Sequence, residues 1–368
     1  MTTRSNRVQI EKMTVSAYRV RTDFPESDGT LEWDSTTMVL VEVFGGGMHG
    51  LGYTYASQSS AVLIHEKLKE LVCGSDAMDI ANTWQRMIHS VRNLGLAGVC
   101  ASAISAVDSA LWDLKAKILH VPLVKLLGQV RQGVPVYGSG GFTSYSIAQL
   151  QKQLGDWAAS GIGMVKMKIG REAEKDYARV KAAREAIGPA VELFVDANGG
   201  YERKQALGQA EAFAELDVSW FEEPVSADDL DGLRLLRERA PGRMEIAAGE
   251  YGYEAQYFRR MLQAGAVDVL QADATRCCGT TGFMQVDALC SAFGMPLSAH
   301  TAPALHLHAC CAAQRLRHLE YFHDHARIEG MFFDGAIVPQ DGLLIPELSR
   351  PGMGLEFKAR DARQYLIS

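Results

Sequence analysis

The stretch MVKMKIG, residues 164–170, decides the fold and the chemistry expected of this chain. Its apolar residues alternate with Lys166 and Lys168, which is typical of a buried strand that brings two like charges to one face of a sheet. Two crowded, desolvated ammonium groups lower each other's pKa, so Lys168 is a candidate general base. A Lys-x-Lys pair is also common on solvated strand faces. The residues that follow decide between these two interpretations.

From about residue 131 the chain repeats one unit, in which a short apolar strand is followed by a polar residue and then by a helix rich in alanine and charged residues. Helices are expected at residues 172–187 and 202–216, for example. Alternating units of this size predict a parallel sheet, and eight strands predict a closed barrel. The expected strands are residues 134–137, 164–169, 192–196, 218–222, 245–248, 267–272, 296–299 and 319–322.

Each strand from the second to the eighth is followed by, or ends in, an ionisable residue. The intervals between these residues are 28, 26, 28, 23, 27 and 20, close to the length of one strand-helix unit. In such barrels the catalytic groups lie at the carboxyl ends of the strands, so all of them are expected in one mouth. One or two would fit chance, but a run in register does not. The residues are Lys168, Asp196, Glu222, Glu250, Asp273, His300 and Glu320.

Three of these residues are carboxylates on successive strands, namely Asp196, Glu222 and Glu250. Converging carboxylates repel one another unless a cation lies between them, and oxygen ligands suit a hard ion such as Mg²⁺. The alternative is that each carboxylate pairs with a lysine or arginine. The common register favours the metal. Glu223 is expected to point to the opposite face of its strand and to support the metal ligands from behind.

Two candidate bases flank this metal site. Lys168 stands on one side, with Lys166 available to depress its pKa or to bind a substrate carboxylate. His300 stands on the other side, and Asp273 is placed to hydrogen-bond its imidazole and fix the tautomer. Glu320, if protonated, can donate a hydrogen bond to a developing enolate oxygen. The remaining histidines of the C-terminal third are interpreted as structural: His306, His308, His318, His323 and His325.

The first 130 residues do not show the repeated strand-helix pattern. Residues 7–20 and 36–43 read as strands of a small sheet, and residues 60–120 turn helical, with a long apolar stripe at 102–118. The acidic, turn-rich segment 22–34 is expected to be a loop. The glycine-rich segment 45–56 is expected to be either a hairpin with exposed aromatic residues or a lid.

Composition favours a small-molecule enzyme. The net charge of −7 and the dispersed Lys and Arg residues provide no basic surface for nucleic acid or an anionic membrane. No run of 18 apolar residues and no signal-peptide pattern is present, so a cytoplasmic protein is expected. The seven cysteines lack C-x-x-C spacing and read as reduced, buried side chains, including Cys277 and Cys278.

The chain resembles the enolase superfamily and, within it, the mandelate racemase subgroup. VKMKIG is similar to the family's Lys-x-Lys strand. FVDANGGY, WFEEP and AAGE resemble its three metal-ligand strands, and LQADATRCCGTTG and LSAHT resemble the segments that carry the Asp/His pair. AISAVDSALWDLKAKILHVPLVKLLG resembles the helix that leads into the barrel. A sixth strand that ends in Asp273 rather than in a lysine separates this subgroup from the muconate-cycloisomerase-like one.

The resemblance implies a (β/α)7β modified TIM barrel at residues 131–339 with an α+β capping domain at residues 1–130, which the tail at about 340–368 completes. It also implies Mg²⁺ as cofactor, a small-molecule carboxylate as substrate, a homo-oligomer, and two N-terminal loops that close the site. Asp23, Glu26 and Asp28 in the first loop can bind hydroxyls or remain solvated. Three residues near strand ends are candidate substrate ligands: Ser139, Asn198 and Arg276.

Abstraction of the proton next to a carboxylate leads to two outcomes. If His300 then expels a β-hydroxyl group as water, the enzyme is a dehydratase of a sugar acid. If the carbon is reprotonated from its other face, it is a racemase or epimerase of a 2-hydroxy acid. The polar, acidic first loop favours dehydration, whereas Trp33, Tyr53 and Tyr55 keep the racemase open. A barrel that only binds ligands is the remaining alternative, although every expected catalytic position is filled.

Overall fold

The N-terminal part of the chain is an antiparallel sheet packed against helices. The structure is a computed structural model and describes residues 7–368, so the first six residues of the predicted capping domain lie outside the described residues. The strands β1 (Ile10–Ser27), β2 (Glu32–Gly45) and β3 (Met48–Tyr55) pair in that order. The helices of this part are α1 (Ser59–Leu63), the π-helix η1 (Ile64–Leu68), α2 (Lys69–Val72), α3 (Ile80–Ser90), α4 (Val99–Ile118) and α5 (Leu123–Leu127).

The glycine-rich segment 45–56 is neither an exposed hairpin nor a lid. It forms β3, which pairs with β2 along its whole length and packs on α4. A methyl group on Gly50 or Gly52 would overlap backbone atoms of α4, so the glycines permit a close contact between strand and helix. Tyr53 lies on the opposite face of β3, where it is fully buried: its ring stacks on Phe333, and its hydroxyl donates to Glu329 Oε1 at 2.6 Å. The prediction of exposed aromatic residues is therefore wrong for Tyr53, because the glycines mark close packing rather than mobility.

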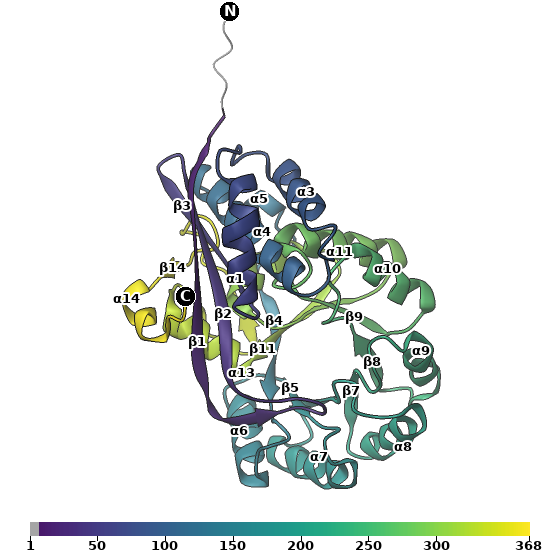
Figure 1. Ribbon diagram of the computed structural model, residues 1–368. Helices are drawn as coiled ribbons and strands as arrows, with labels where there is room; N and C mark the ends of the chain where they lie inside the picture. Colours follow the sequence, from purple (N-terminus) through teal and green to yellow (C-terminus); the bar gives the residue numbers. More distant parts are fainter. Residues whose placement is uncertain (1–6) are drawn as a thin grey trace, which may run out of the picture.

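The segment 22–34 is also different from the predicted loop. β1 and β2 continue through most of it, and their register shifts between Arg21 and Glu26 before pairing resumes. Only a short turn at residues 28–31 separates the two strands. Figure 1 shows this long hairpin, in purple, reaching from the capping domain to the mouth of the barrel beside β5 and β7. Polar strand residues are stable here because the hairpin faces the cavity and the barrel instead of an apolar core.

The predicted barrel is confirmed. Eight parallel strands form one sheet, which closes because β11 pairs with β4. Their short apolar stretches, rich in β-branched and aromatic residues, suit strands that are buried on both faces. The strands are β4 (Val134–Gly140), β5 (Met164–Lys168), β6 (Glu192–Asp196), β7 (Val218–Glu222), β8 (Glu245–Ala248), β9 (Val269–Ala272), β10 (Leu297–Ala299) and β11 (Leu316–Phe322).

Helices connect successive strands and surround the barrel (Figure 1). Seven lie between β4 and β11, in agreement with the (β/α)7β arrangement, and α13 (His323–Phe332) follows β11 directly. In the part of the chain that the structure describes, no helix combines the length and the apolar character needed to cross a membrane. The seven helices are α6 (Ile147–Ala159), α7 (Ala173–Ile187), α8 (Arg203–Ala214), α9 (Leu230–Arg239), α10 (Ala255–Ala264), α11 (Gly279–Phe293) and α12 (Pro303–Ala312).

The C-terminal tail returns to the N-terminal sheet. Gly352 forms a bridge with Pro122, and the backbone N–H of Ile367 donates a hydrogen bond to the carbonyl of Ala17 at 2.8 Å. The N–H of Ala17 in turn donates to the carbonyl of Ser368 at 2.8 Å. The end of the tail therefore pairs with β1, whereas Leu343 and Leu344 pair antiparallel with barrel strand β4. Its elements are β12 (Phe333–Asp334), β13 (Leu343–Leu344), β14 (Glu356–Phe357), α14 (Ala359–Ala362) and η2 (Arg363–Tyr365).

Candidate active site

Three carboxylates converge at the carboxyl ends of neighbouring strands. Asp196 and Glu222 are the last residues of β6 and β7, and Glu250 follows β8. Each offers an oxygen, and these oxygens lie within 4.8 Å of one another. All three side chains are buried, with exposed fractions of 5% or less. Three buried anions so close together need positive charge between them, and oxygen donors fit a hard divalent cation such as Mg²⁺.

Both lysines of the Lys-x-Lys strand reach this cluster. Lys166 Nζ lies 2.6 Å from Glu222 Oε1, 2.9 Å from Glu320 Oε1 and 3.3 Å from Asp196 Oδ2. Lys168 Nζ lies 2.5 Å from Asp196 Oδ2. Lys166 is completely buried, so it supports the carboxylates from below and does not reach the cavity. Lys168 lines the cavity and is the lysine available to a ligand.

The pKa of Lys168 is raised in this structure, contrary to the prediction of a lowered value. Burial lowers the pKa and so does the neighbouring Lys166, but the charge of Asp196 outweighs both. The same balance holds for Lys166, where the charges of Glu222 and Glu320 overcome the effect of burial. Opposite charges at hydrogen-bond distance favour the charged form more strongly than the second ammonium disfavours it. A neutral Lys168 therefore requires that its ion pair with Asp196 is released.

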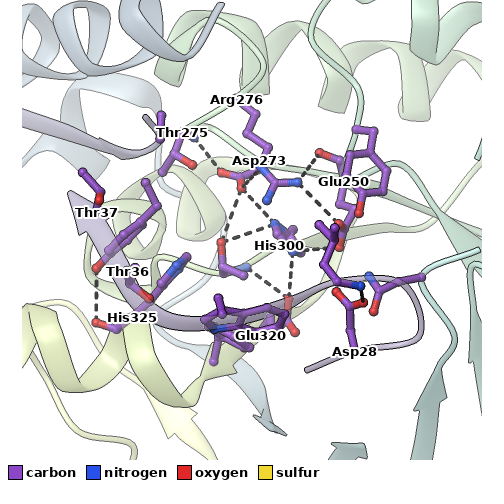
Figure 2. Close-up of a pocket in the computed structure, with 18 of the residues that line it drawn as sticks. Asp28, Thr36, Thr37, Glu250, Asp273, Thr275, Arg276, His300, Glu320 and His325 are labelled. Carbon is purple, nitrogen blue, oxygen red and sulfur yellow. Dashed lines mark hydrogen bonds and ion pairs between the residues drawn. The ribbon is translucent and has the colours of Figure 1, made fainter. Parts of the chain in front are cut away.

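The imidazole of His300 is held between two carboxylates. Its Nδ1 lies 2.8 Å from Asp273 Oδ2, and its Nε2 lies 2.9 Å from Glu250 Oε2 (Figure 2). Burial lowers the pKa of His300, but the charges of Glu250 and Glu320 and the hydrogen bond to Asp273 raise it to about 9. His306, which the sequence analysis treated as structural, accepts a hydrogen bond from the N–H of Ala274. Asp273 fixes the proton on Nδ1 of His300, and Nε2 faces the carboxylate cluster through Glu250.

Glu320 is an ionised acceptor rather than a neutral donor in this structure. Ser139 Oγ donates to Glu320 Oε1 at 2.5 Å, and the N–H of Thr301 donates to Oε2 at 3.3 Å. Burial raises the pKa of Glu320, but Lys166 and His300 outweigh it, and the net shift is downward. Ser139 is buried and does not line the cavity. It therefore holds Glu320, whereas the sequence suggested a direct substrate contact.

A cavity of about 440 Å³ opens in front of these groups, between the barrel and the capping hairpin. Asn198 lines it beside Lys168, whose Nζ donates to Asn198 Oδ1 at 3.0 Å. The Arg276 guanidinium also lines it, donates to the carbonyl of Glu250 at 3.1 Å and stacks over the ring of Tyr251. The predicted site residues that line the cavity are Lys168, Asn198, Glu250, Asp273, Arg276, His300 and Glu320; those behind them are Ser139, Lys166, Asp196 and Glu222.

The capping domain supplies further cavity residues. Thr36 of the hairpin, which the sequence did not single out, lines the cavity, and so does Tyr55 at the end of β3, one of the aromatic residues noted above. His325 at the start of α13, which was predicted to be structural, also lines it. Asp28, one of three acidic residues noted in the first loop, is 6% exposed and also lines it, while Glu26 is fully buried. The alternative that these two carboxylates, Glu26 and Asp28, remain solvated is therefore wrong. No local motif marks the cavity residues of the hairpin and of α13, because these segments are far apart along the chain and meet only in the folded protein.

A second group of potential metal ligands lies under the hairpin, formed by Glu26, His323 and Asp324. These residues already have protein partners. Trp33 Nε1 donates to Glu26 Oε2 at 2.9 Å, and Thr36 Oγ1 donates to Asp324 Oδ2 at 3.1 Å. The cluster joins the hairpin to α13 and thereby fixes one wall of the cavity.

Left-handed backbone conformations gather at the barrel mouth. Asn198, Glu223, Thr301 and Ala302 have φ values of 45°, 39°, 52° and 42° directly after strand ends. Such conformations are unfavourable for residues other than glycine and are maintained where surrounding contacts fix the chain. Glu223 is buried and, among the described residues, no group hydrogen-bonds to its carboxylate oxygens. Burial and the charges of Glu250 and Asp196 raise its pKa well above the usual value, which shows that it lies near the metal-ligand candidates.

The comparisons with known proteins agree with this site. Residues 11–128 match the family described as mandelate racemase / muconate lactonizing enzyme, N-terminal domain, and residues 149–362 match the family described as enolase C-terminal domain-like. A 3,6-anhydro-alpha-L-galactonate cycloisomerase of Streptomyces coelicolor is 34% identical over 84% of this chain and 88% of its own length. An L-talarate/galactarate dehydratase of Salmonella typhimurium is 33% identical over 75% of this chain and 70% of its own length.

Solved structures also resemble this chain. A mandelate racemase/muconate lactonizing enzyme-like protein from Rubrobacter xylanophilus superposes with a TM-score of 0.96 at 56% identity, covering 98% of this chain and 100% of its own. A racemase from Streptomyces coelicolor with bound magnesium has a TM-score of 0.91 at 31% identity, covering 97% of this chain and 100% of its own. The magnesium in that structure agrees with the cofactor predicted from the carboxylates here. The chain is an enzyme that belongs to the enolase superfamily, in its mandelate racemase subgroup.

Proposed function

We propose that this enzyme is a sugar-acid dehydratase, which removes the proton next to a carboxylate and then expels the β-hydroxyl group as water. The observation that carries the proposal is the pairing of two bases with a polar cavity. Lys168 and His300 both line the cavity beside the metal-ligand candidate Glu250. The capping domain contributes polar side chains to the same cavity that suit a chain of hydroxyl groups: Asp28, Ser35, Thr36, Thr37 and Ser57.

The metal ion belongs to this proposal. Asp196, Glu222 and Glu250 would hold Mg²⁺, because their oxygens converge within 4.8 Å and are buried. When bound, the ion polarises the substrate carboxylate and so stabilises the negative charge that follows loss of the α-proton. Lys166 remains below the carboxylates and offsets part of their charge, since its Nζ contacts all three of Asp196, Glu222 and Glu320.

Proton transfer is assigned to side chains on two sides of the cavity. Lys168 accepts the α-proton after its ammonium group has lost a proton and its ion pair with Asp196 has been released. His300, protonated and oriented by Asp273, then donates a proton to the β-hydroxyl oxygen. That oxygen takes the electrons of the breaking C–O bond and leaves as water. The remaining enol gains a proton on carbon and becomes a keto acid.

Racemisation or epimerisation is the second candidate, because the same two bases can exchange the α-proton on both faces of the carbon. The aromatic residues Trp33 and Tyr55 line the cavity and would suit an aryl substituent. The relatives support sugar acids more strongly, since one is named as a dehydratase of talarate and galactarate and another as a cycloisomerase of a galactonate derivative. Both relatives therefore act on oxygen-rich chains.

Incubation with Mg²⁺ and a panel of five- and six-carbon aldonic and aldaric acids tests the proposal. We expect one or more members to yield a keto acid that a carbonyl reagent detects. Absence of keto acid, together with α-proton exchange in D₂O for another 2-hydroxy acid, would establish the racemase instead. The single variants Lys168→Ala and His300→Asn separate the two bases: each is expected to abolish dehydration, and a native activity that survives the double variant would refute the site assignment.

A further inference from the structure

His325 occupies a place in the cavity that the proposed reaction does not use. It lies in the first turn of α13, five residues beyond Glu320, and its side chain lines the cavity. Figure 2 shows His325 and Glu250 on opposite sides of His300. The ring is therefore away from the metal-ligand candidates, on the side where the capping hairpin covers the cavity. A polar group at this position would face the part of a ligand that extends beyond its reacting carbons.

The hydrogen bond at one nitrogen determines the tautomer of this ring. The backbone N–H of Ala302 donates to His325 Nδ1 at 3.3 Å, so Nδ1 must carry a lone pair rather than a proton. Burial lowers the pKa of His325 well below its usual value, and the ring is consequently neutral. A neutral imidazole that accepts at Nδ1 carries its proton on Nε2. His325 is thus a hydrogen-bond donor at Nε2.

Two aromatic neighbours fix the direction of this donor. The ring of Tyr55 stacks on His325 with a centroid distance of 3.4 Å and an interplanar angle of 6°. Phe322 packs edge-on at 5.0 Å and 77°. Tyr55 also donates from its hydroxyl to the carbonyl of His325 at 3.3 Å. The imidazole is therefore held by the barrel on one side and by β3 of the capping domain on the other.

The Nε2–H group has no partner within the protein. Across residues 7–368 no side chain or carbonyl accepts a hydrogen bond from it; the hydrogen bond of the ring is the one at Nδ1. Nε2 is not one of the fully buried polar atoms that lack a hydrogen-bond partner. Since it has no partner in the protein, it must therefore be accessible, at the surface of the cavity that His325 lines. A fixed donor that faces a cavity without an internal acceptor is suited to an oxygen of a ligand.

We propose that His325 is a substrate-binding residue, whose Nε2–H donates a hydrogen bond to an oxygen of the sugar acid on the side of the cavity remote from the metal-ligand candidates. This inference rests on the proposed function for the substrate class, but the donor itself follows from the contacts of His325. A purely structural His325 would only support the strained backbone at Ala302, whose φ is 42°. The two roles use different nitrogens and can be separated.

The substitution His325→Asn removes the Nε2 donor and keeps an oxygen near the position of Nδ1, where it can still accept from Ala302. His325→Gln places an amide nitrogen near the position of Nε2 and serves as the conservative variant. His65→Asn is the control, because His65 is exposed on the π-helix η1 and does not line the cavity.

Binding is measured by calorimetry with Mg²⁺ and two kinds of probe. Glycolate carries only the carboxylate and the adjacent hydroxyl, whereas the acids of the panel carry further oxygens. For the acid that binds best we expect His325→Asn to weaken binding roughly tenfold, the size of one hydrogen bond. Glycolate binding should not change, His325→Gln should recover part of the loss, and the control should match the wild type. Equal losses for both probes, or no loss, would overturn the inference.

A measurement on the unmodified enzyme covers the case in which the variants do not fold. Nitrogen NMR of the histidine side chains should show His325 with a proton on Nε2 only, and its Nε2 signal should shift with the long acid but not with glycolate. The opposite tautomer would overturn the inference, and so would a wild type that binds no long acid better than glycolate. If a long acid binds through His325 but yields no keto acid, the proposed dehydration fails while the inference stands.

Discussion

Gly29, at the tip of the β1–β2 hairpin, lies so close to the carbonyl oxygen of Ala197 that no side chain fits between them. A methyl group on Gly29 would overlap that oxygen and would lie 2.9 Å from the carbonyl oxygen of Ile169. Ala197 directly follows Asp196, and Ile169 directly follows Lys168. The hairpin tip therefore rests on the two chain segments that carry a metal-ligand candidate and a candidate base. The position of the hairpin over the cavity and the positions of Asp196 and Lys168 therefore depend on each other through Gly29.

The substitution Gly29→Ala should lower kcat/KM by roughly 10²-fold, because displacing the hairpin by even about 1 Å misplaces groups that surround the substrate. Gly163→Ala is the control, because nothing lies within 4 Å of a methyl group there. Ile169 and Ala197 are buried members of the main hydrophobic core, so circular dichroism should first establish that both variants are folded under the assay conditions. Equal kinetics for the two variants would show that the hairpin tip does not govern the site.

The barrel and the order of its strand-end residues could be predicted from the sequence because each βα unit carries its own signal. A short apolar strand, an ionisable residue and a helix recur, so that Lys168, Asp196 and Glu222 could each be placed from local pattern alone. The hydrogen bond between Asp273 and His300 followed from the same register, since β9 and β10 are neighbours in the sheet. The local sequence pattern is sufficient to predict which strand-end residues meet wherever strands that are consecutive in sequence are also neighbours in the sheet.

The cavity wall opposite the barrel could not be predicted in the same way. Thr36 contacts Asp324 and Tyr55 stacks on His325, although about 270 to 290 residues separate the partners. Such pairs depend on how the capping domain sits on the barrel, and no periodic pattern in one chain encodes that placement. The glycine-rich segment was misread for a related reason. Glycine permits both mobile turns and close packing, and only the position of α4 distinguishes them.

The packing of β3 on α4 leads to a stability prediction. A methyl group on Gly52 would overlap backbone atoms of Ala106 and Ala110 in α4. We expect Gly52→Ala to lower the free energy of unfolding by about 3 kcal/mol, the upper part of the range for overpacked cores. Denaturant unfolding followed by circular dichroism measures this change, with Gly163→Ala again as the control. A loss below about 0.5 kcal/mol would mean that the strand and helix separate without cost.

A second stability prediction concerns pH and the buried pair of Glu26 and Asp324. Burial and the neighbouring charge of Asp324 raise the pKa of Glu26 from 4.5 to about 9. Between these two pH values the folded protein holds a proton that the unfolded chain has released, so stability falls as the pH rises and the full cost is reached above about pH 9. The slope attributable to this group is at most about 1.4 kcal/mol per pH unit.

The substitution Glu26→Gln should remove this contribution. Its amide oxygen can accept from Trp33 Nε1, as Glu26 Oε2 does at 2.9 Å, and its amide nitrogen can donate to Asp324 in place of the carboxyl proton. We expect the variant to exceed the wild type in melting temperature at pH 9 and to match it at pH 5. Glu245→Gln is a control, because Glu245 pairs with Arg317 at the opposite end of the barrel. Parallel pH profiles for wild type and Glu26→Gln would contradict the assignment.

Metal binding provides the sharpest test of the carboxylate cluster. Glu222 is completely buried, and its Oε1 contacts Lys166 Nζ at 2.6 Å. Glu222→Gln removes one of the three anionic ligands and leaves a neutral amide beside the lysine, so Mg²⁺ affinity should fall by at least roughly tenfold. Calorimetric titration of Mg²⁺ without substrate measures this loss independently of activity, and Glu245→Gln should bind Mg²⁺ like the wild type. Among the described residues, Glu222 is the third ligand that completes a group with Asp196 and Glu250, their oxygens lying within 4.8 Å of one another. Unchanged Mg²⁺ affinity in Glu222→Gln would therefore show that the ion binds elsewhere.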